Sequence, residues 1–434
     1  MKLRYLVVGV LVGVVSFAAV ALAGGGPKTK LVSRASNGDP AANGYSYPGG
    51  ITPNGRWVPF ESDADNLPGA TGDYQVYVRD RKTGSTKLVS KSNSGDPGDD
   101  DSYDASISDD GRFIAFESYA SNLPGSLGPT YLQAYVRDLK KGTTKLVSRL
   151  GGGDPATGGA SNDASISANG RLVAFESDAN NLPGNLSPDD QVYLKDRKTG
   201  ALKLISKTSG GTPANEDSED PAISPNGRIV GFESESTNLP GGLGGGDDEI
   251  YVRDLEGGRT LLVSKSNAGD PANDDTDDVA LSANGRFVGF ESYATNLPGS
   301  IGPTYKQVYL RDRKRNKTTL VSRTNNGDPA TGDSSDNASV SANGKLVQFE
   351  SYATNFPGGG TYSQVLIRDT DAGKTRLVSR SNSGNPGEGD GSFMKAESNL
   401  ISRDPRFSAF NSYASNLPGA SPPYSQAEIR GPNP

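Results

Sequence analysis

The sequence predicts an all-β fold, a seven-bladed β-propeller with four antiparallel strands in each blade. The first observation is a short motif that recurs seven times; its clearest copy, residues 282–292, is a turn followed by an alternating apolar run. A fixed period of about 58 residues is typical of propellers and solenoids. The copies are spaced by 56 to 61 residues and surround Gly55, Gly111, Gly170, Gly227, Gly285, Gly344 and, in a degraded form, Pro405.

The second observation is that each repeat supplies four strands. In the second repeat, a short first strand at 104–108 turns through Asp109-Asp110-Gly111 into a second strand at 112–118. A long loop leads to a third strand at 133–138, and a tight turn leads to a fourth at 144–149. Asp-Gly and Asn-Gly pairs between apolar runs are strong hairpin signals. Four antiparallel strands per repeat favour a propeller over a linear β-solenoid.

The third observation is that the two ends of the chain complement each other. The last repeat ends with its third strand, at 426–430, and has no fourth strand. Residues 29–34, at the other end, match the fourth-strand pattern. We therefore expect residues 29–34 to pair with the last blade and close the ring, because an open array would leave that edge unpaired.

The first 23 residues have the pattern of a secretory signal peptide. Lys2 and Arg4 precede an apolar stretch, and Ala21-Leu22-Ala23 is a small-x-small cleavage pattern. An uncleaved anchor is the alternative, because residues 5–23 are just long enough to span a bilayer. We expect cleavage, which leaves residues 24–434 as a single propeller domain. We expect this domain to be monomeric, not inserted in a membrane, and exported to the periplasm, the cell surface or the medium.

The composition excludes several kinds of chemistry. There is no cysteine and no histidine, so disulfides, metal sites with Cys or His ligands and histidine-dependent catalysis are ruled out. Cleavage of the leader would change the formal charge from −7 to 42 − 51 = −9. An acidic exported chain without a reader motif is not expected to bind nucleic acid.

Two strand patterns recur in the repeats, Ser-x-x-Gly-Arg-x-x-x-Phe-x-Ser and Val-Tyr-Val-Arg-Asp, the latter as in residues 76–80. They resemble the TolB-like, WD40-like β-propeller repeat of exported bacterial proteins, and the resemblance covers residues 29–430. It implies the propeller fold. The wider family includes protein-binding scaffolds, gating propellers of peptidases and a few polysaccharide lyases. This chain has longer loops than the usual repeat and no separate catalytic domain.

Strand direction sorts the loops onto two faces. In an antiparallel blade both long loops lie on one face, here called the upper face, and both short hairpins lie on the lower face. Binding residues are usually carried on such loops. The upper loops are acidic, with Asp99 to Asp101, Asp104, Glu216, Asp217, Glu219, Asp274, Asp275 and Asp277. The lower hairpins are basic, with Arg81, Lys82, Lys140, Lys141, Arg197, Lys198, Arg313 and Lys314. A disc with oppositely charged faces would steer charged partners.

A ring of acidic residues at the start of the first strands is the first candidate binding site. It would lie at the top of the central channel and suits a cation or a basic peptide. Alternatively, each side chain satisfies backbone groups of its own loop. Calcium would accept such oxygen ligands, but no Asp-x-Asp-x-Asp-Gly loop is present, so we expect no metal and no cofactor. The ring consists of Asp104, Asp163, Asp220, Asp278 and Asn337.

Tyrosines of the upper loops are the second candidate site. Rigid aromatic rings bind peptides or sugars with little entropy cost, although they could also cover loop backbone and neighbouring strands. The candidates are Tyr119, Tyr131, Tyr293, Tyr305, Tyr352 and Tyr362, with Tyr413 and Tyr424 in the last repeat.

A glutamate ends the second strand of six repeats. Catalytic carboxylates need two different environments, and a ladder of equivalent glutamates lacks this difference, so we expect hydrogen bonding to the following loop. The sequence thus predicts a non-catalytic scaffold that binds a protein or peptide through its upper face. A carbohydrate- or cell-wall-binding propeller is the second reading, and a polysaccharide lyase or hydrolase is the third. The glutamates are Glu61, Glu117, Glu176, Glu233, Glu291 and Glu350, with Asn411 in the last copy.

Overall fold

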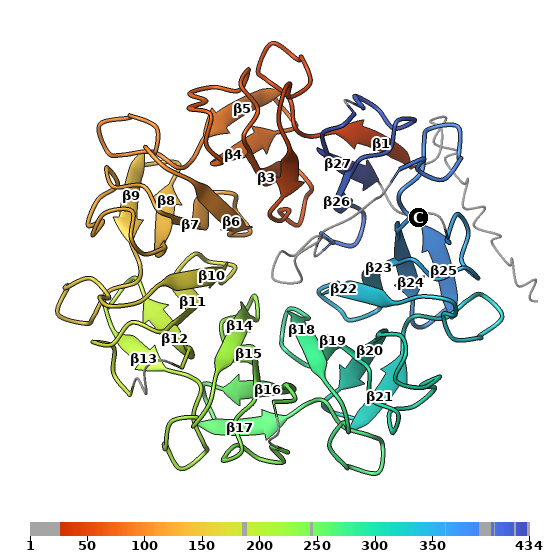
Figure 1. The fold of residues 1–434 in the computed structure, drawn as a ribbon. Helices are drawn as coiled ribbons and strands as arrows, with labels where there is room; N and C mark the ends of the chain where they lie inside the picture. The colour runs from red at the N-terminus through yellow and green to blue at the C-terminus, as the bar shows by residue number, and fades with distance from the viewer. Residues whose placement is uncertain are drawn as a thin grey trace, which may run out of the picture.

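The computed structural model describes residues 27–184, 189–243, 246–360, 362–389, 401–402, 404–420 and 422–431. These residues form seven sheets arranged around a central axis, as Figure 1 shows. No helix in the described residues is long and apolar enough to cross a membrane. The predicted class, an all-β seven-bladed propeller, is confirmed. The predicted signal peptide lies outside the described residues.

Six blades have four antiparallel strands, ordered along the chain from the axis outward (Figure 1). Blade 1 comprises β2–β5 (Ser46–Pro48, Trp57–Ser62, Gln75–Asp80, Ser85–Leu88) and blade 2 comprises β6–β9 (Ser102–Ile107, Phe113–Ser118, Gln133–Asp138, Thr143–Leu146). Blade 3 comprises β10–β13 (Ser161–Ile166, Leu172–Ser177, Gln191–Asp196, Leu202–Leu204) and blade 4 comprises β14–β17 (Ser218–Ile223, Ile229–Ser234, Glu249–Asp254, Arg259–Leu262). Blade 5 comprises β18–β21 (Thr276–Leu281, Phe287–Ser292, Gln307–Asp312, Lys317–Leu320) and blade 6 comprises β22–β25 (Ser335–Val340, Leu346–Ser351, Gln364–Asp369, Lys374–Leu377).

Blade 7 is built from both ends of the chain. It contains β26 (Ser408–Ser412), β27 (Gln426–Gly431) and, as its outer strand, β1 (Lys28–Leu31). β1 pairs antiparallel with β27, and the Thr29 hydroxyl donates to the Arg380 carbonyl of blade 6 at 2.7 Å. The predicted closure of the ring is therefore confirmed. The first strand predicted for the last repeat falls on a segment that includes residues 390–400, which lie outside the described residues.

The outer strands are shorter than the sequence predicts. In blade 2 the strand ends at Leu146 instead of residue 149. The Ser148 hydroxyl accepts a hydrogen bond from the Ala134 amide at 3.2 Å and donates one to the Gln133 side chain at 3.1 Å. The Val147 amide still donates to the Ala134 carbonyl at 2.8 Å, but the Ser148 hydroxyl takes the Ala134 amide, because a serine hydroxyl competes well for backbone groups.

The core lies between adjacent blades as well as within them. Val76 and Val78 of blade 1 pack in one buried cluster with Ile114 and Phe116 of blade 2. Within blade 2, Phe116 stacks on Tyr135, with ring centroids 5.7 Å apart. Since fully burying one such side chain contributes about 1.5–3 kcal/mol, each blade depends on its neighbours for stability.

The turn glycine of the repeated motif also contacts the neighbouring blade. Gly170 of blade 3 has φ +67°, and a Cβ placed on it would overlap the Phe113 ring of blade 2. The same contact joins Gly344 to Phe287 and Gly111 to Trp57. Glycine is therefore required here by the positive φ and by the close approach of a second blade.

Candidate binding surface on the upper face

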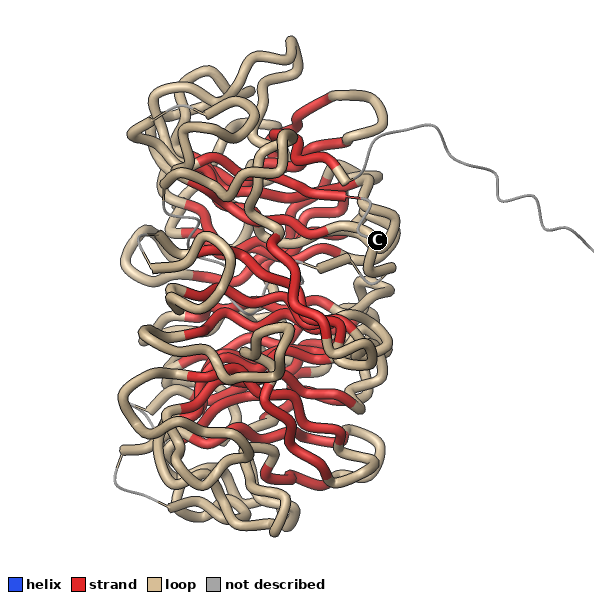
Figure 2. The backbone as a smooth tube through the Cα atoms, turned by 90° about the vertical axis from the view of Figure 1, so that its right-hand side faces the viewer, coloured by secondary structure: helices blue, strands red, loops and turns tan. Residues whose placement is uncertain are grey.

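Antiparallel pairing places the starts of the first and third strands and the end of the second strand at the same edge of every blade. Figure 2, which shows the disc edge-on, has the strands in the middle and loops on both faces. The long loops that follow the second and fourth strands of each blade therefore share the upper face, and the side chains at these strand ends surround its centre.

The predicted acidic ring lies on the innermost strands β6, β10, β14, β18 and β22. Its members are Asp104, Asp163, Asp220, Asp278 and Asn337, each the third residue of its strand, with φ between 45° and 56°. Asp and Asn tolerate this left-handed conformation better than other non-glycine residues, which explains why they recur at this position. The register between the first and second strands shifts at this point, for example between Tyr103 and Ser106.

The glutamate ladder links this ring from blade to blade. The backbone amide of Asp104 donates to the Glu61 carboxylate of blade 1 at 2.8 Å, and that of Asp220 donates to Glu176 of blade 3 at 2.7 Å. Equivalent bonds join Asp163 to Glu117 and Asp278 to Glu233. The glutamates thus form structural hydrogen bonds, as the sequence predicts. Their partner is not the following loop, as expected, but the innermost strand of the next blade.

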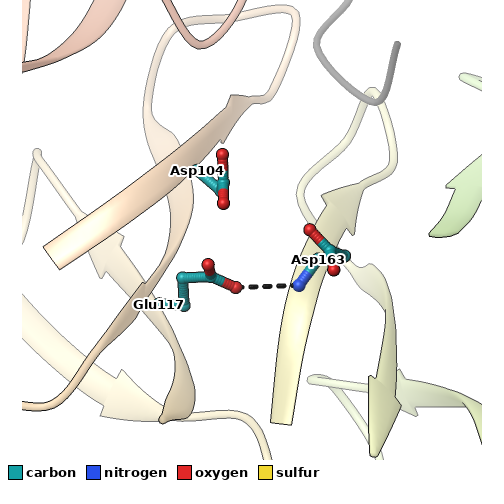
Figure 3. Close-up of side chains that lie close together, drawn as sticks. All are labelled: Asp104, Glu117 and Asp163. Atoms are coloured by element: carbon teal, nitrogen blue, oxygen red, sulfur yellow. Dashed lines mark hydrogen bonds between the residues drawn. The ribbon is translucent and has the colours of Figure 1, made fainter. Parts of the chain in front are cut away.

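The ring and the ladder together create clusters of carboxylates. Figure 3 shows Asp104, Glu117 and Asp163 close together, with the bond from the Asp163 amide to Glu117 dashed. One carboxylate oxygen from each of these residues lies within 4.8 Å of the others. Such oxygens could ligate Ca²⁺ or accept hydrogen bonds from an ammonium or guanidinium group. Two further clusters of this kind are Asp163, Glu176 and Asp220, and Asp190, Asp217 and Glu219.

Two positions at the upper edge vary from blade to blade and divide the surface into two halves. The second residue of the innermost strand is Tyr47, Tyr103, Asn162, Glu219, Asp277 and Asp336 in blades 1 to 6. The residue before the third strand is Tyr74, Leu132, Asp190, Asp248, Lys306, Ser363 and Ser425 in blades 1 to 7. Blade 1 is therefore aromatic at both positions, and blade 2 is aromatic at the first and has Leu132 at the second. Blades 3 to 6 carry an acidic arc, defined as Asp190, Glu219, Asp248, Asp277 and Asp336.

Six half-buried tyrosines of blades 7, 1 and 2 form a continuous tyrosine ladder. Tyr424 lies 5.2 Å from Tyr45 between ring centroids, and Tyr45 lies 6.5 Å from Tyr47. Tyr47 continues to Tyr74 at 6.5 Å, and Tyr74 continues to Tyr103 at 5.6 Å. The sixth member, Tyr413, lies 6.3 Å from Tyr45, and its hydroxyl is 3.4 Å from that of Tyr47. Each ring is half-buried, so the ladder is held by packing and is still partly accessible to solvent.

The predicted tyrosines are more scattered than the ladder. Tyr119 and Tyr131 lie in blade 2, Tyr293 and Tyr305 in blade 5, and Tyr352 and Tyr362 in blade 6. Five of them are half-buried and Tyr362 is exposed. Lys306 lies over the Tyr293 ring at 5.4 Å, beside its ion pair with Asp277.

Sequence reasoning included Tyr413 and Tyr424 but missed Tyr45, Tyr47, Tyr74 and Tyr103. A position-by-position alignment of the repeats would have revealed Tyr47, Tyr74 and Tyr103 as departures from the other blades.

Burial and mutual repulsion raise the pKa of several carboxyl groups in the acidic arc. Burial, with neighbouring carboxylates, raises the pKa of Asp190 to about 6, of Glu219 to about 7 and of Asp248 to about 7. The same causes raise the pKa of Glu291 well above its usual range. These carboxyl groups therefore gain or lose protons near neutral pH. Protonation weakens the attraction of the surface for cations, and ionisation strengthens it.

These pKa values predict that acidification stabilises the fold. Unfolded Asp and Glu titrate near pH 4, so between about pH 4 and 7 the folded chain binds more protons than the unfolded chain. The free energy of unfolding then falls as pH rises through this window. We expect Tm to be higher at pH 5 than at pH 8 by about 5 °C, allowing for solvent screening of half-buried groups.

Thermal denaturation monitored by circular dichroism at the two pH values checks this expectation. The variant Asp190→Asn/Glu219→Gln/Asp248→Asn should raise Tm at pH 8 and flatten the pH dependence. A parent protein that melts at the same or a higher temperature at pH 8 than at pH 5 would contradict it. Asp138, whose pKa is held at about 2 chiefly by its hydrogen bond with Arg112, stabilises the fold throughout this window, and that contribution is lost only as pH falls below about 4.

Comparison with known proteins supports the fold. The chain matches no protein-family model, and no curated protein sequence is similar to it. A prolyl endopeptidase structure is similar with a TM-score of 0.53 at 13% identity, covering 90% of this chain and 50% of that one. TolB from Acinetobacter baumannii gives 0.42 at 17% identity, covering 80% of this chain and 65% of TolB. The β-propeller domain of the Trilobed protease from Pyrococcus furiosus gives 0.49 at 11% identity, covering 86% and 93%. At 13% identity the similarity to the prolyl endopeptidase structure shows the fold alone.

Proposed function

We propose that this protein is a non-catalytic binding protein whose upper face binds a basic segment of a protein or peptide partner. The observation that carries the proposal is the junction of the tyrosine ladder with the carboxylates on one face. Tyr103, the last ring of the ladder, is directly opposite Glu117 in the β6–β7 register, and Glu117 belongs to the first carboxylate cluster. A ligand that crosses this point meets aromatic rings and then carboxylates.

The chemistry of the two halves favours a basic peptide over a neutral glycan. Tyrosine rings contribute contact area at low entropy cost and also accept cations over their faces. Carboxylates in the acidic arc attract the positively charged side chains of lysine and arginine, and most glycans carry no positive charge. An enzyme would need carboxyl groups with contrasting roles, whereas the carboxylates of the ring and the ladder are repeated around the axis. The proposal includes export after cleavage of residues 1–23, a single domain over 24–434 and a monomeric state.

Neutralising the acidic arc is expected to weaken binding of a basic peptide at least tenfold at pH 8. The test titrates octalysine, and a peptide that alternates lysine with phenylalanine, into the parent and into Asp190→Asn/Glu219→Gln/Asp248→Asn by calorimetry. The matched control neutralises two exposed acids of the lower hairpins, Glu256→Gln and Asp371→Asn. The loss should shrink as salt rises, because exposed charges are screened.

Three results would contradict the proposal. The first is equal affinity of the acidic-arc variant and the control variant. The second is binding that is unchanged at pH 5, where Asp190, Glu219 and Asp248 take up protons and lose their charge. The third is a neutral oligosaccharide on a glycan array that binds equally well to parent and variant, which would favour the carbohydrate reading. Hydrolysis or elimination of a polysaccharide by the purified domain would show that it is an enzyme.

A further inference from the structure

A hydrogen-bonded clamp joins neighbouring blades on the outer side of the ring. In blade 2, Arg137 of the third strand donates to the Lys91 and Ser92 carbonyls of blade 1 and to the Thr144 hydroxyl of its own blade, at 2.9–3.2 Å. The Thr144 amide donates to the Asn93 side chain of the preceding loop at 2.7 Å. An arginine, a threonine and a serine or asparagine thus tie each blade to the previous one.

The clamp recurs at six of the seven junctions within the described residues. Its arginines are Arg79, Arg137, Arg253, Arg311, Arg368 and Arg430. Its threonines, with the side chains that accept their amides, are Thr86 with Ser36, Thr144 with Asn93, Thr260 with Ser209, Thr318 with Asn267, Thr375 with Asn325 and Thr29 with Asn382.

The junction between blades 2 and 3 departs from this clamp at all three positions. Lys195 replaces the arginine, Leu202 replaces the threonine and Gly151 replaces the serine or asparagine. Lys195 retains only the bonds to the Arg149 and Leu150 carbonyls, at 2.7 and 3.1 Å. Three departures at one junction, each of which removes a polar group or a guanidinium, leave this junction without the full clamp.

A groove of about 700 Å³ lies at this junction. Grooves at the clamped junctions of blades 1 and 2 and of blades 7 and 1 measure about 510 and 500 Å³. Phe113 forms an apolar side of the larger groove, with the guanidinium groups of Arg112 and Arg197 at 4.6 and 4.4 Å from its ring centre.

The groove carries a large excess of positive charge. Its lining contains eight cationic side chains and one carboxylate, Asp138. Arg112 pairs with Asp138 at 2.7 Å, and Arg171 pairs with Asp196 just outside the groove at 2.6 Å. Subtracting these two leaves six cationic groups that make no ion pair across the groove: Lys141, Lys145, Arg149, Lys195, Arg197 and Lys198.

We propose that the groove between blades 2 and 3 binds a small phosphate-bearing anion, with two linked phosphate groups as the best fit. Guanidinium groups match phosphate oxygens in pairs, and ammonium groups add point charges. A lining with six cationic groups outside these ion pairs favours a multiply charged ligand over a single carboxylate, because the attraction rises with ligand charge. The groove is lined by lower-hairpin residues such as Lys141 and Lys198 and by the start of the loop after β9, where Gly151 lies beside Gly200. Its lining includes no residue of the acidic ring, the acidic arc or the tyrosine ladder, so this site does not depend on the proposed peptide binding.

The state of Lys195 gives the site a distinctive signature. Burial, together with the charge of Arg149, lowers the pKa of Lys195 to about 8. A bound anion favours the charged ammonium and raises that pKa, so binding should be accompanied by proton uptake at pH 8 to 9. Arginine at this position would not show this exchange, because its guanidinium stays protonated.

The test is calorimetric titration of the protein beginning at residue 24 with pyrophosphate, inorganic phosphate and acetate, in buffers of different ionisation enthalpy. Pyrophosphate should bind at least tenfold more tightly than phosphate and take up protons at pH 8.5, while acetate should not bind. The clamp-restoring variant Gly151→Asn/Lys195→Arg/Leu202→Thr should lose at least tenfold in pyrophosphate affinity, keep or raise Tm and abolish proton uptake.

The next junction supplies the matched control. Opening the clamp between blades 3 and 4, with Ser209→Gly, Arg253→Lys and Thr260→Leu, should leave pyrophosphate affinity unchanged whatever it does to Tm. The exposed pair Lys141→Gln/Lys198→Gln should reduce affinity about three- to tenfold without a change in fold. Absence of pyrophosphate binding by the parent at millimolar concentration, or equal affinity of the parent and the clamp-restoring variant, would overturn the proposal.

Discussion

A chain that begins at Ala35 is expected to lose the cooperative fold of the whole ring, compared with a chain that begins at Pro27. The truncation removes β1, whose Thr29 and Leu31 are buried, and the buried Val32 that follows it. Burying each apolar side chain contributes about 1.5–3 kcal/mol, and each orphaned ladder group costs about 1–3 kcal/mol. The sum is comparable with the 5–15 kcal/mol that stabilises a typical domain.

Circular dichroism melting and light scattering after size exclusion would measure this effect. The truncated chain should melt at a much lower temperature or without a sharp transition. It should also self-associate, because β27 would present an unpaired edge. A synthetic peptide of residues 27–34, added in trans, should restore part of the stability. If the truncated chain melted as a monomer at the temperature of the parent, the contribution of β1 would be refuted.

Gly170→Ala is expected to destabilise the ring by about 2–5 kcal/mol, which is large for the addition of one methyl group. The left-handed backbone, φ +67°, costs an L-residue about 1–2 kcal/mol, and overpacking against Phe113 adds about 1–3 kcal/mol. Gly258→Ala is the matched control, because Gly258 has φ +64° and no atom within 4 Å of a Cβ. Gly258→Ala should lower the free energy of unfolding only by the backbone contribution, about 1 kcal/mol.

A second substitution separates the clash from the backbone strain. At the equivalent contact of Gly227, the residue of the preceding blade is Leu172, and a Cβ would lie 2.9 Å from it. Phe113→Leu in the Gly170→Ala background should therefore recover part of the loss, so the double mutant should be more stable than the sum of the two single variants. Urea unfolding measures these free energies. Equal destabilisation by Gly170→Ala and Gly258→Ala would show that the contact between blades contributes nothing.

The sequence was sufficient for the architecture because the determining signals are local. Asn284-Gly285 and the alternating run after it specify a hairpin without reference to distant residues, and counting the strands revealed the exchange between the two ends of the chain. The same local reading placed Asp104 and its equivalents on the innermost strands. It missed their hydrogen bonds to Glu61 and its equivalents, because those partners are in the preceding blade.

The tyrosine ladder shows why the rest of the candidate site could not be read from the sequence. Tyr45 and Tyr424 lie near opposite ends of the chain and become neighbours only when blade 7 closes against blade 1. The pairs chosen from the sequence, such as Tyr119 and Tyr131, were close within one loop. Local spacing selected residues that share a loop, whereas the contact that matters depends on closure of the ring.

The tyrosine ladder crosses the seam between blades 7 and 1, so the ligand binding proposed for the upper face would be thermodynamically linked to ring closure. A ligand that spans Tyr424, Tyr45 and Tyr74 binds the closed ring and not the opened one, so it stabilises closure by RT ln(1 + [L]/Kd). At a ligand concentration one hundred times Kd this amounts to about 2.7 kcal/mol. A partner bound to the upper face would then stabilise the closed ring in addition to the β1–β27 pairing. Loss of that pairing would lower the affinity for the partner.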